Sequence, residues 1–597
     1  MEEEMILQRL EWEDAREDTE KLYYRKNKDV RKEGKCMILS PLGRLDFMTY
    51  FNLFSAEKWR RYTGVREGFF ALDMEGAVVV TVWALSVSGE RKKIHEETLK
   101  NSARQEAVTG PFAFPDSGVI GVELSSGGNV TRIYGGYYGT SRQPVEENEI
   151  QIGIAVCTYR REQYVKRNMD YLKERILEND SALSAGHVSV CISDNAGTLK
   201  KEEIEREDIR IVKNKNLGGV GGFTRGMIEH MRSGRKITHV LLMDDDAVLS
   251  AAAIERTYRL LTILKPEFRD SLIGGSLIQE DLPCILYETG ARWNDGEIEA
   301  IHHGLDLTRL EDALKNEAEE KTEYAGWWYC CIPVSFIKEK GFPLPLFIHR
   351  DDIEYGLRAE GKFIFLNGIC VWHEAFENKL PGFLEYYDMR NLAIANAVHD
   401  PGYGAKDFKK MLFIQVGSNV GKYRYKYVDL NLKGAADFLR GAEWFLRQDT
   451  MELHAGLAKY NYETRDSLEY AGYRGIREEE LDPCSRPEEE PPGLLTRVFR
   501  IAAMNGHFFP VKTKIRTARP NPNIYELYRC REVIFADSTG KAICVRRSVR
   551  ELFKAYIKLL KTYRMIDRYY ERACASYRKD YELMISERFW KRYLEIE

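Results

Sequence analysis

The spacing of apolar residues changes twice along the chain. Up to about residue 148, apolar positions alternate with polar ones or form short Val-rich runs, as at 78–82, and glycines and acidic residues interrupt them. Such runs are typical of β-strands. From about 149 to 400, short apolar runs alternate with segments of helical period. From 401 onward the period is helical, as at 435–446 and 550–570.

This rhythm predicts an α/β protein with three regions. Residues 1–148 are expected to form an N-terminal β-sandwich or barrel domain, 149–400 a mostly parallel sheet with helices on its faces, and 401–597 a helical C-terminal region. The Glu/Pro-rich segment 475–493 predicts a loop or linker. The central region has expected strands at 152–158, 188–193, 209–213 and 239–243, and expected helices at 162–178 and 223–232.

Three consecutive acids follow one of these strands. Asp244, Asp245 and Asp246 stand at the carboxyl end of 239–243, which is where ligands bind in parallel sheets. Their mutual repulsion is relieved by a divalent cation, and hard oxygen ligands suit Mg²⁺ or Mn²⁺. Asp244 and Asp246 can face the same ion, and His373 can complete the site with a neutral imidazole. The alternative is a solvated acidic turn with a structural histidine.

A second acidic pair, Asp351 and Asp352, comes about a hundred residues later and is followed by Glu354. Transfer of a sugar to a hydroxyl group needs a carboxylate that takes the hydroxyl proton and a cation for the leaving diphosphate. Two separate acidic clusters on one sheet supply both. The alternative is salt bridging at the start of a helix. Trp327 and Trp328 suit stacking on a sugar, although consecutive Trp residues can also be buried.

Other strand ends carry groups that suit a nucleotide. Thr158 and Arg161 follow the first strand of the central region, and Asp194 ends the second. An Asp can accept hydrogen bonds from a base or ribose, and an Arg can pair with a diphosphate. The glycine-rich run 218–222, which includes Gly219, lets a backbone approach a ligand and opens a helix with Arg225 near its start. Turns and helix caps are the alternatives.

Composition and charge narrow the class of protein. Hydrophobic residues make up 44% and charged residues 30%, as in ordinary globular proteins, and the net charge of −4 argues against a general nucleic-acid binder. The 11 Cys include no CxxC pair, which favours a reducing compartment over a zinc cluster or a disulfide framework. The first 18 residues lack an apolar segment, and the longest apolar run, 76–88, is too short to span a bilayer. We therefore expect a cytoplasmic protein.

The end of the chain is basic. From residue 495 to 597 there are 23 Lys/Arg and 11 Asp/Glu, a local net charge of +12, and the basic residues alternate with aromatic ones. On a helix this pattern can rest on anionic lipid headgroups. It is equally compatible with a solvated helical face over a packed core.

Together, seven motifs resemble those of inverting family 2 glycosyltransferases, most closely the UDP-galactofuranosyltransferases that polymerise cell-wall galactan. The similar segments cover roughly residues 40 to 400. Tyr50-Phe51-Asn52-Leu53-Phe54 with Trp59 is similar to that family's N-terminal β domain, and Tyr386-Tyr387-Asp388-Met389-Arg390-Asn391 to a segment after its catalytic His. The motifs themselves are Thr-Tyr-Arg-Arg from 158, Asp-Asn-Ala-Gly from 194, Gly-Gly-Val-Gly-Gly-Phe-Thr-Arg-Gly from 218, Asp-Asp-Asp from 244, Trp-Trp-Tyr from 327, Asp-Asp-Ile-Glu-Tyr-Gly-Leu-Arg from 351 and Trp-His from 372.

The resemblance implies a GT-A fold, UDP-galactofuranose as donor and Mn²⁺ or Mg²⁺ as cofactor. It implies Asp352 as catalytic base with Asp351 as the fallback. It also implies a glycan or lipid-linked glycan acceptor, peripheral contact with the inner face of the cell membrane, and a homo-oligomer. By motif match, the metal ligands would be Asp244, Asp246 and His373, the nucleotide contacts Thr158, Arg161, Asp194, Gly219, Arg225 and Asp245, and the sugar contacts Trp327, Trp328 and Glu354.

The sequence departs from this family at two places. His349-Arg350 stand where an aromatic residue is expected, and the aromatic trio ends in Tyr329. Both places belong to the acceptor side, so the acceptor, the linkage and processivity stay open. Two alternatives also stay open: the same chemistry with another donor, such as a nucleotide-linked rhamnose, or a non-catalytic carbohydrate-binding protein on the same fold.

Overall fold

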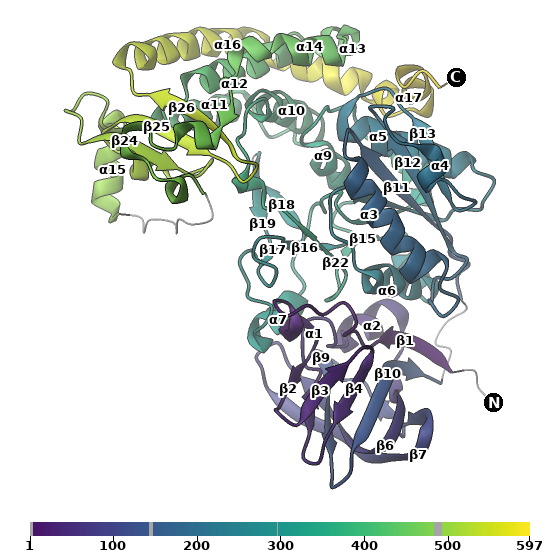
Figure 1. Cartoon of the computed structure of the whole chain (residues 1–597). Coiled ribbons are helices and arrows are strands. Elements are labelled where there is room, and N and C mark those ends of the chain that lie inside the picture. The colour runs from purple at the N-terminus through teal and green to yellow at the C-terminus, as the bar shows by residue number, and fades with distance from the viewer. Residues whose placement is uncertain (1–3, 142–146, 295, 483–491, 597) are drawn as a thin grey trace.

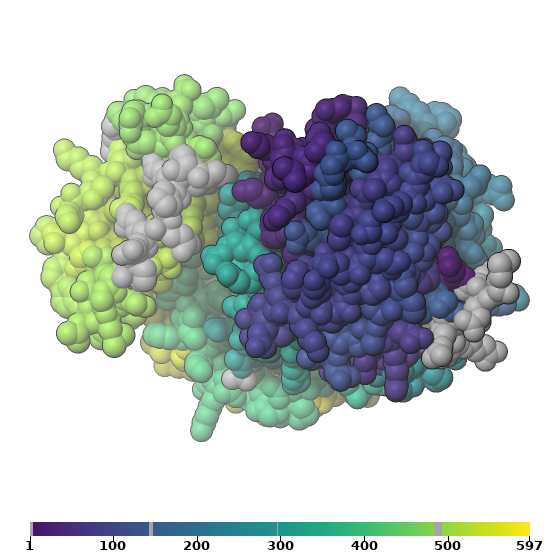
Figure 2. Space-filling view, turned by 90° about the horizontal axis from the view of Figure 1, so that it is seen from below, coloured from purple at the N-terminus to yellow at the C-terminus, as the bar shows by residue number. Residues whose placement is uncertain are grey.

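The computed structural model describes residues 4–141, 147–294, 296–482 and 492–596. Figure 1 shows the N-terminal strands at the bottom, the parallel sheet with its helices at the upper right, and the C-terminal helices along the top with a small sheet at the left. Seen from below, the green to yellow part of the C-terminal region lies at the left and the purple N-terminal region at the centre and right, with teal residues from the middle of the chain between them (Figure 2). The predicted mixed α/β architecture is confirmed.

The N-terminal sheet forks along its longest strand, β6 (Glu67–Leu85). The first half of β6 pairs with β10 (Thr131–Thr140) and the second half with β9 (Val119–Ser126), while β7 (Arg91–Val108) follows the other edge. The change of partner falls at Gly76, where φ is 110° and a Cβ would lie 2.7 Å from the Val130 carbonyl oxygen, so glycine is required. The other elements are β1 (Met5–Arg9), β2 (Arg25–Lys26), β3 (Val30–Glu33), β4 (Cys36–Leu39), β5 (Arg44–Asp46), β8 (Phe112–Ala113), α1 (Glu20–Tyr23) and α2 (Ala56–Thr63).

The central sheet has four parallel strands followed by an antiparallel one. Its strand order is β13-β12-β11-β14-β20-β15-β21. Thr158 pairs with Asp194 and Cys157 with Asp244, so the ends of three strands share one edge. The four parallel strands agree with the predicted ones to within one residue. The strands are β11 (Ile152–Thr158), β12 (Val188–Asp194), β13 (Ile209–Lys213), β14 (His239–Asp244), β15 (Leu272–Gly274), β20 (Cys330–Pro333) and β21 (Phe363–Ile364).

Helices cover this sheet, and α5 packs on β11 and β12. The predicted helix 162–178 is an α-helix up to Leu172 and then a π-turn at Lys173–Leu177. The predicted helix 223–232 begins earlier, because the glycine run forms its first turn. The helices are α3 (Glu162–Leu172), α4 (Lys201–Ile204), α5 (Gly218–Arg232) and α6 (Ala251–Thr262).

A smaller sheet stands beside the acidic edge. Strand β16 (Ser276–Gln279) pairs in parallel with β22 (Cys370–His373) and antiparallel with β17 (Leu286–Glu288). These pairings bring His373 and Glu288, the last residues of β22 and β17, into one small sheet. The neighbouring elements are β18 (Ala291–Asn294), β19 (Glu297–Ala300), α7 (Leu310–Glu317), α8 (Val334–Lys340) and α9 (Asp351–Leu357).

The sequence predicted a helical C-terminal region, but the structure is not purely helical there. It also contains a four-stranded sheet of order β23-β26-β25-β24. The predicted helix 435–446 is broken at Gly441, where φ is 83°. The elements are α10 (Leu384–His399), α11 (Ala405–Gly421), α12 (Tyr425–Phe438), α13 (Ala442–Arg447), α14 (Thr450–Gly456), β23 (Arg465–Asp466), α15 (Leu494–Ala502), β24 (Thr513–Ala518), β25 (Cys530–Ala536), β26 (Lys541–Arg546), α16 (Val549–Met584) and α17 (Glu587–Tyr593).

Residues 483–491 of the predicted linker 475–493 lie outside the described residues, and its described part includes a short 3₁₀ turn at Glu478–Leu481. In the part of the chain that the structure describes, no helix combines the length and the apolar character that a membrane span requires.

Candidate active site

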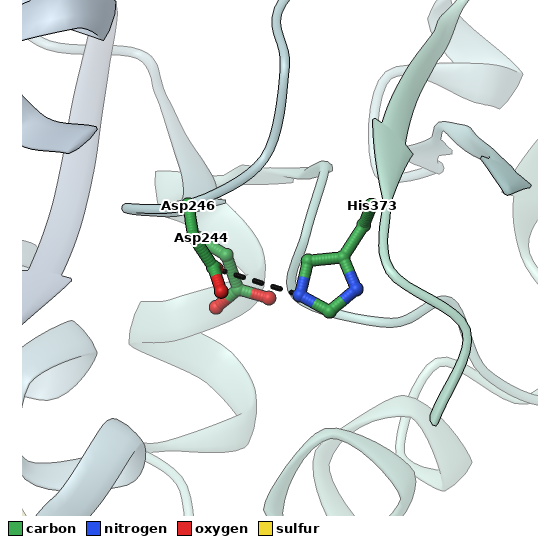
Figure 3. A group of neighbouring side chains, drawn as sticks. All are labelled: Asp244, Asp246 and His373. Atoms are coloured by element: carbon green, nitrogen blue, oxygen red, sulfur yellow. Dashed lines mark ion pairs between the residues drawn. The ribbon is translucent and has the colours of Figure 1, made fainter. Parts of the chain in front are cut away.

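Asp244, Asp246 and His373 lie together at the edge of the central sheet (Figure 3). One ligand atom from each lies within 4.8 Å of the others, and His373 Nε2 is 3.4 Å from Asp246 Oδ1. A pair of backbone hydrogen bonds of 2.8 and 3.1 Å between Val248 and Trp372 joins the two segments that carry them. The local pairing of these segments therefore brings residues more than a hundred positions apart into one cluster.

The charges in this cluster are partly balanced. Arg161 lies 3.1 Å from Asp245 and also contacts Asp246. Burial raises the pKa of Asp244, and the neighbouring Asp246 raises it further. Burial acts in the same direction on Asp246, but His373 and Arg161 outweigh it and hold the pKa of Asp246 below its usual range. Two carboxylates and an imidazole are ligands that suit Mn²⁺ or Mg²⁺, so these residues fit the expected cation.

A cavity of about 270 Å³ connects the first acidic cluster with the second. Asp244 of the first cluster lines it together with Asp351 and Asp352 of the second, so the two clusters meet at one space. Both predicted Trp residues line it as well. The lining residues are Gly219, Phe223, Asp244, Tyr287, Glu288, Ile298, Tyr324, Trp327, Trp328, Ile348, His349, Asp351, Asp352, Ile353 and Phe376.

The second acidic pair begins helix α9 and is poorly solvated. Asp351 is 8% exposed, and burial together with the charge of Asp352 raises its pKa. Burial also raises the pKa of Asp352, although the charges of His349 and Arg350 oppose this. A carboxylate whose pKa is raised toward neutrality is a better proton acceptor than an ordinary one. The pair is therefore suited to general base chemistry.

The two Trp side chains form an apolar wall. Trp327 packs edge-on against Phe223 and Tyr355, and the Trp328 indole donates to the Gly275 carbonyl oxygen at 3.0 Å. Both are largely buried, with 5% and 6% of their surface exposed. The exposed parts offer a flat apolar surface within the cavity, which suits a sugar ring.

The glycine run mainly serves packing. A Cβ at Gly218, where φ is 74°, would lie 2.9 Å from the Phe347 ring, and one at Gly222 would lie 2.2 Å from Cys157 Sγ. These glycines let α5 approach β11 and the segment before Asp351. Gly219 differs because it lines the cavity, and its nearest neighbour there is Asp351 Oδ2.

Two predicted ligand-binding residues lie elsewhere. Arg225 does not line the cavity, and its guanidinium pairs with Glu229 at 2.8 Å along α5. Glu354 is fully buried, and its carboxylate accepts hydrogen bonds from Arg358 and from the Leu344 amide and pairs with His399. The prediction that Glu354 binds sugar is therefore corrected, because its oxygens hold α9 in place.

The predicted nucleotide residues at the first two strand ends are also engaged. Asp194 is 2% exposed, and its oxygens accept from the amides of Ala196, Gly197 and Leu199. Asp194 therefore stabilises a turn, which is the alternative to nucleotide binding that the sequence left open. Thr158 is buried at the end of β11. Arg161 remains half-exposed beside the first acidic cluster, so it can reach a ligand there.

Glu288 and His349 line the cavity but were not among the predicted site residues. Glu288 is 3% exposed, one of its oxygens has no hydrogen-bond partner among the described residues, and burial, with the charges of Asp352 and Glu377, raises its pKa to about 8. His349 also lines the cavity. Glu288 belongs to a three-residue strand without neighbouring motif residues, so only its contacts identify it. His349 stood out in the sequence as a departure from the family pattern.

Comparison with known proteins agrees with the motif resemblance. Residues 8–139 match the family described as Galactofuranosyltransferase 2 N-terminal. Galactofuranosyltransferase GlfT2 of Mycobacterium tuberculosis (strain ATCC 25618 / H37Rv) is 27% identical over 434 residues, which are 67% of this chain and 66% of that protein. Its counterpart from Mycolicibacterium smegmatis (strain ATCC 700084 / mc(2)155) is 26% identical over 434 residues, 68% and 65% of the two chains. The alignments thus span just under two thirds of each relative.

A mannosyltransferase structure, PcManGT from Pyrobaculum calidifontis in complex with GDP-Man and Mn²⁺, is 10% identical with a TM-score of 0.28 and covers 55% of this chain and 83% of its own. At that TM-score the likeness says nothing about this chain. Both sequence relatives are named galactofuranosyltransferases. The predicted resemblance to galactofuranosyltransferases is confirmed.

Proposed function

We propose that this protein is an inverting, metal-dependent glycosyltransferase that moves galactofuranose from UDP-galactofuranose to a glycan or lipid-linked glycan. The observation that carries the proposal is the single cavity that joins Asp244 of the cation-type cluster to the buried pair Asp351 and Asp352. Its relatives are named galactofuranosyltransferases, which supports the choice of donor. The order of the central strands and the antiparallel β20 support a GT-A fold for this region.

In the proposed reaction, the acceptor hydroxyl lies against Asp352, which takes its proton as the oxygen attacks the anomeric carbon. The bond from that carbon to the UDP oxygen breaks, and the electron pair leaves with UDP, so the configuration inverts. A divalent cation held by Asp244, Asp246 and His373 would supply positive charge for the departing diphosphate. Arg161, beside the same acids, is available to pair with a phosphate oxygen. Trp327 and Trp328 orient the sugars and exclude water.

The test is UDP release from UDP-galactofuranose with Mn²⁺ and short galactofuranosyl acceptors. UDP-galactopyranose, a nucleotide-linked rhamnose and an EDTA-treated sample are the controls. Turnover that needs both the furanose donor and the metal supports the proposal. Turnover with the rhamnose donor alone would mean the same transfer reaction with a different donor sugar. Binding of glycans without any transfer would support the non-catalytic alternative.

We also propose that the protein contacts the inner face of the cell membrane through an apolar surface around α15, the helix at the outer left in Figure 1. This surface comprises Leu494, Leu495, Val498, Phe499 and Ile501 of α15, which are 53–86% exposed, and the exposed rings of Phe508, Phe509 and Phe553. Ring contacts of about 6 Å join Phe499 to Phe509 and Phe508 to Phe553, so the surface is continuous from α15 to α16. Basic residues accompany it, namely Arg497, Lys512, Lys514, Lys554 and Lys561.

Apolar side chains flanked by Lys and Arg fit the interface of an anionic bilayer. Sedimentation with vesicles should therefore be strong for phosphatidylglycerol and weak for phosphatidylcholine. Leu495→Asp combined with Ile501→Asp should abolish it, whereas Leu282→Asp, at an exposed apolar position elsewhere, should not. If the double variant still sediments with the vesicles, this surface is not the contact. Light scattering of the same variants would detect a second copy of the chain on this face instead.

A further inference from the structure

The segment that leads into the acidic pair is held in one conformation by helix α10. Asp388 accepts hydrogen bonds from His349 Nδ1 and, at 3.2 Å, from Arg350 Nε. One turn along the same helix, Asn391 donates to the carbonyl oxygens of Phe347 and His349 at 3.2 and 2.7 Å. Both residues belong to the motif at 386–391, so the motif fixes this segment.

The backbone around His349 is strained. Ile348 and Arg350 both have a φ of 72°, a left-handed conformation that is costly for a β-branched residue. Such a conformation persists only when surrounding contacts over-determine it, and it is concentrated at ligand sites. The Arg350 guanidinium makes a further contact that holds this segment, 5.1 Å from the centre of the Trp293 ring. The strained backbone and these contacts together fix the orientation of the His349 imidazole.

The bond to Asp388 leaves one ring nitrogen for the cavity. Because Nδ1 points to Asp388, Nε2 is the remaining polar atom, and among the described residues it has no hydrogen-bond partner. The His349 side chain is 36% exposed and lines the same cavity as Asp351 and Asp352. Nε2 accepts a hydrogen bond when the ring is neutral and donates one when it is protonated, and a sugar hydroxyl serves in both cases.

The position of His349 indicates which substrate it meets. It stands three residues before Asp352, in the segment that delivers the proposed base, whereas the cation-type cluster comes from β14 and β22. The base must touch the attacking hydroxyl, so a side chain from the same segment lies beside the sugar that carries that hydroxyl. The fixed orientation of the ring makes this contact selective, because little side-chain entropy is lost on binding.

We propose that His349, oriented by Asp388, is an acceptor-binding residue whose Nε2 hydrogen-bonds a hydroxyl group of the glycan acceptor next to the one that Asp352 deprotonates. This inference rests on the proposed transfer reaction, and it assigns acceptor selectivity to a position where the sequence departs from the family pattern. It assigns to Asp388 the role of a positioning residue.

The test compares His349→Phe, which keeps the ring shape without the nitrogens, with His349→Gln, whose amide can reproduce the Nε2 contact. His95→Phe and His95→Gln are matched controls, because His95 also pairs with a carboxylate, that of Glu97, but lies on β7. The measurements are KM for short galactofuranosyl acceptors, KM for UDP-galactofuranose, and acceptor binding by saturation-transfer NMR with UDP and Mg²⁺. Loss of one hydrogen bond corresponds to about a tenfold change.

We expect His349→Phe to raise the acceptor KM about tenfold and leave the donor KM within about twofold, and His349→Gln to recover most of the loss. Asp388→Asn should change the acceptor KM in the same direction, whereas the His95 variants should match the wild type. An unchanged acceptor KM in His349→Phe, or an equal rise in both KM values, overturns the inference.

The NMR arm separates this inference from the proposed function. If the wild type binds the acceptors but transfers nothing, the proposed function fails. Weaker acceptor binding by His349→Phe then still supports the role of His349, and equal binding rejects it. If the wild type binds none of the acceptors, both proposals are rejected.

Discussion

The two acidic clusters face one cavity but differ in how their charge is balanced. In the first, Arg161 and His373 lie against Asp245 and Asp246, and the pKa of Asp246 falls, although burial raises that of Asp244. In the second, none of the ion pairs of the described residues involves Asp351, Asp352 or Glu288, and burial raises the pKa of all three.

This difference separates two kinds of chemistry that the residue type alone does not. Carboxylates kept ionised by cationic neighbours suit a metal ion. Carboxyl groups kept from water and without a direct ion pair hold or accept a proton near neutral pH. The predictions below test this division, beginning with the largest expected effect.

Asp352→Asn should reduce kcat by about 10³-fold or more, because the amide cannot accept the hydroxyl proton. Binding of UDP in the presence of Mn²⁺, measured by calorimetry, should remain. Asp116→Asn, at an exposed residue of the N-terminal region, is the control. Wild-type turnover in Asp352→Asn would transfer the base role to Asp351 or to another residue.

Glu354→Gln should lower the free energy of unfolding by about 3 kcal/mol, since it leaves the buried Arg358 guanidinium without its charged partner. The measurement is urea unfolding followed by circular dichroism, with the exposed Glu360→Gln as control. Asp351 and Asp352, the first two residues of α9, are proposed to act on the substrate, whereas Glu354, its fourth residue, is structural. A Glu354→Gln protein of normal stability and altered sugar binding would reverse that distinction.

Asp246→Asn should weaken Mn²⁺-dependent binding of UDP by about 100-fold and remove its sensitivity to EDTA, because one of the two carboxylate ligands is lost. The same substitution should leave metal-free binding of glycans unchanged. Calorimetric titration of UDP with and without Mn²⁺ measures the first effect, and titration of a short glycan without metal measures the second. If Asp246→Asn and Asp352→Asn weakened Mn²⁺-dependent binding of UDP equally, the two clusters would not be separate in function.

The smallest expected effect concerns stability and pH. The pKa of Glu288 is raised to about 8 in the folded protein, so the folded state binds more protons than the unfolded state between about pH 4.5 and 8. The free energy of unfolding therefore falls as pH rises through this range. Glu288→Gln should remove part of this slope and be more stable than the wild type at pH 8 by about 2 kcal/mol. Urea unfolding at pH 5 and pH 8, with the exposed Glu320→Gln as control, checks this, and identical slopes would contradict it.

Three of the four parallel strands could be predicted closely because each is buried on both faces and reads as an apolar run, as in Ile152–Thr158, whereas β13 carries exposed Arg210 and Lys213. The first acidic cluster could be predicted because its residues follow such strands directly. Glu288 could not, since it comes to the cavity through the pairing of a three-residue strand. Glu354 was misjudged because an ion pair within a helix uses the same residue types as a ligand site.

The C-terminal sheet escaped prediction for a related reason. Its three longer strands are as long as the parallel strands of the central sheet, but charged residues interrupt them, as Lys514 and Arg516 do in β24. The long-range contacts that stabilise such strands leave no period in the sequence. The helices around them, by contrast, repeat their apolar positions over several turns, as α16 does.

The packing of α17 has a consequence for the order in which the protein is made. Phe589 and Trp590 belong to the same apolar cluster as Val220 and Phe223 of α5 and Trp327 of the cavity wall, and the Trp590 indole donates to the Pro343 carbonyl oxygen. Synthesis proceeds from the N-terminus, so the cavity wall waits through the translation of more than two hundred residues for its last partner. Until then, part of its apolar surface is exposed, and this is the interval in which a chaperone would have most to protect.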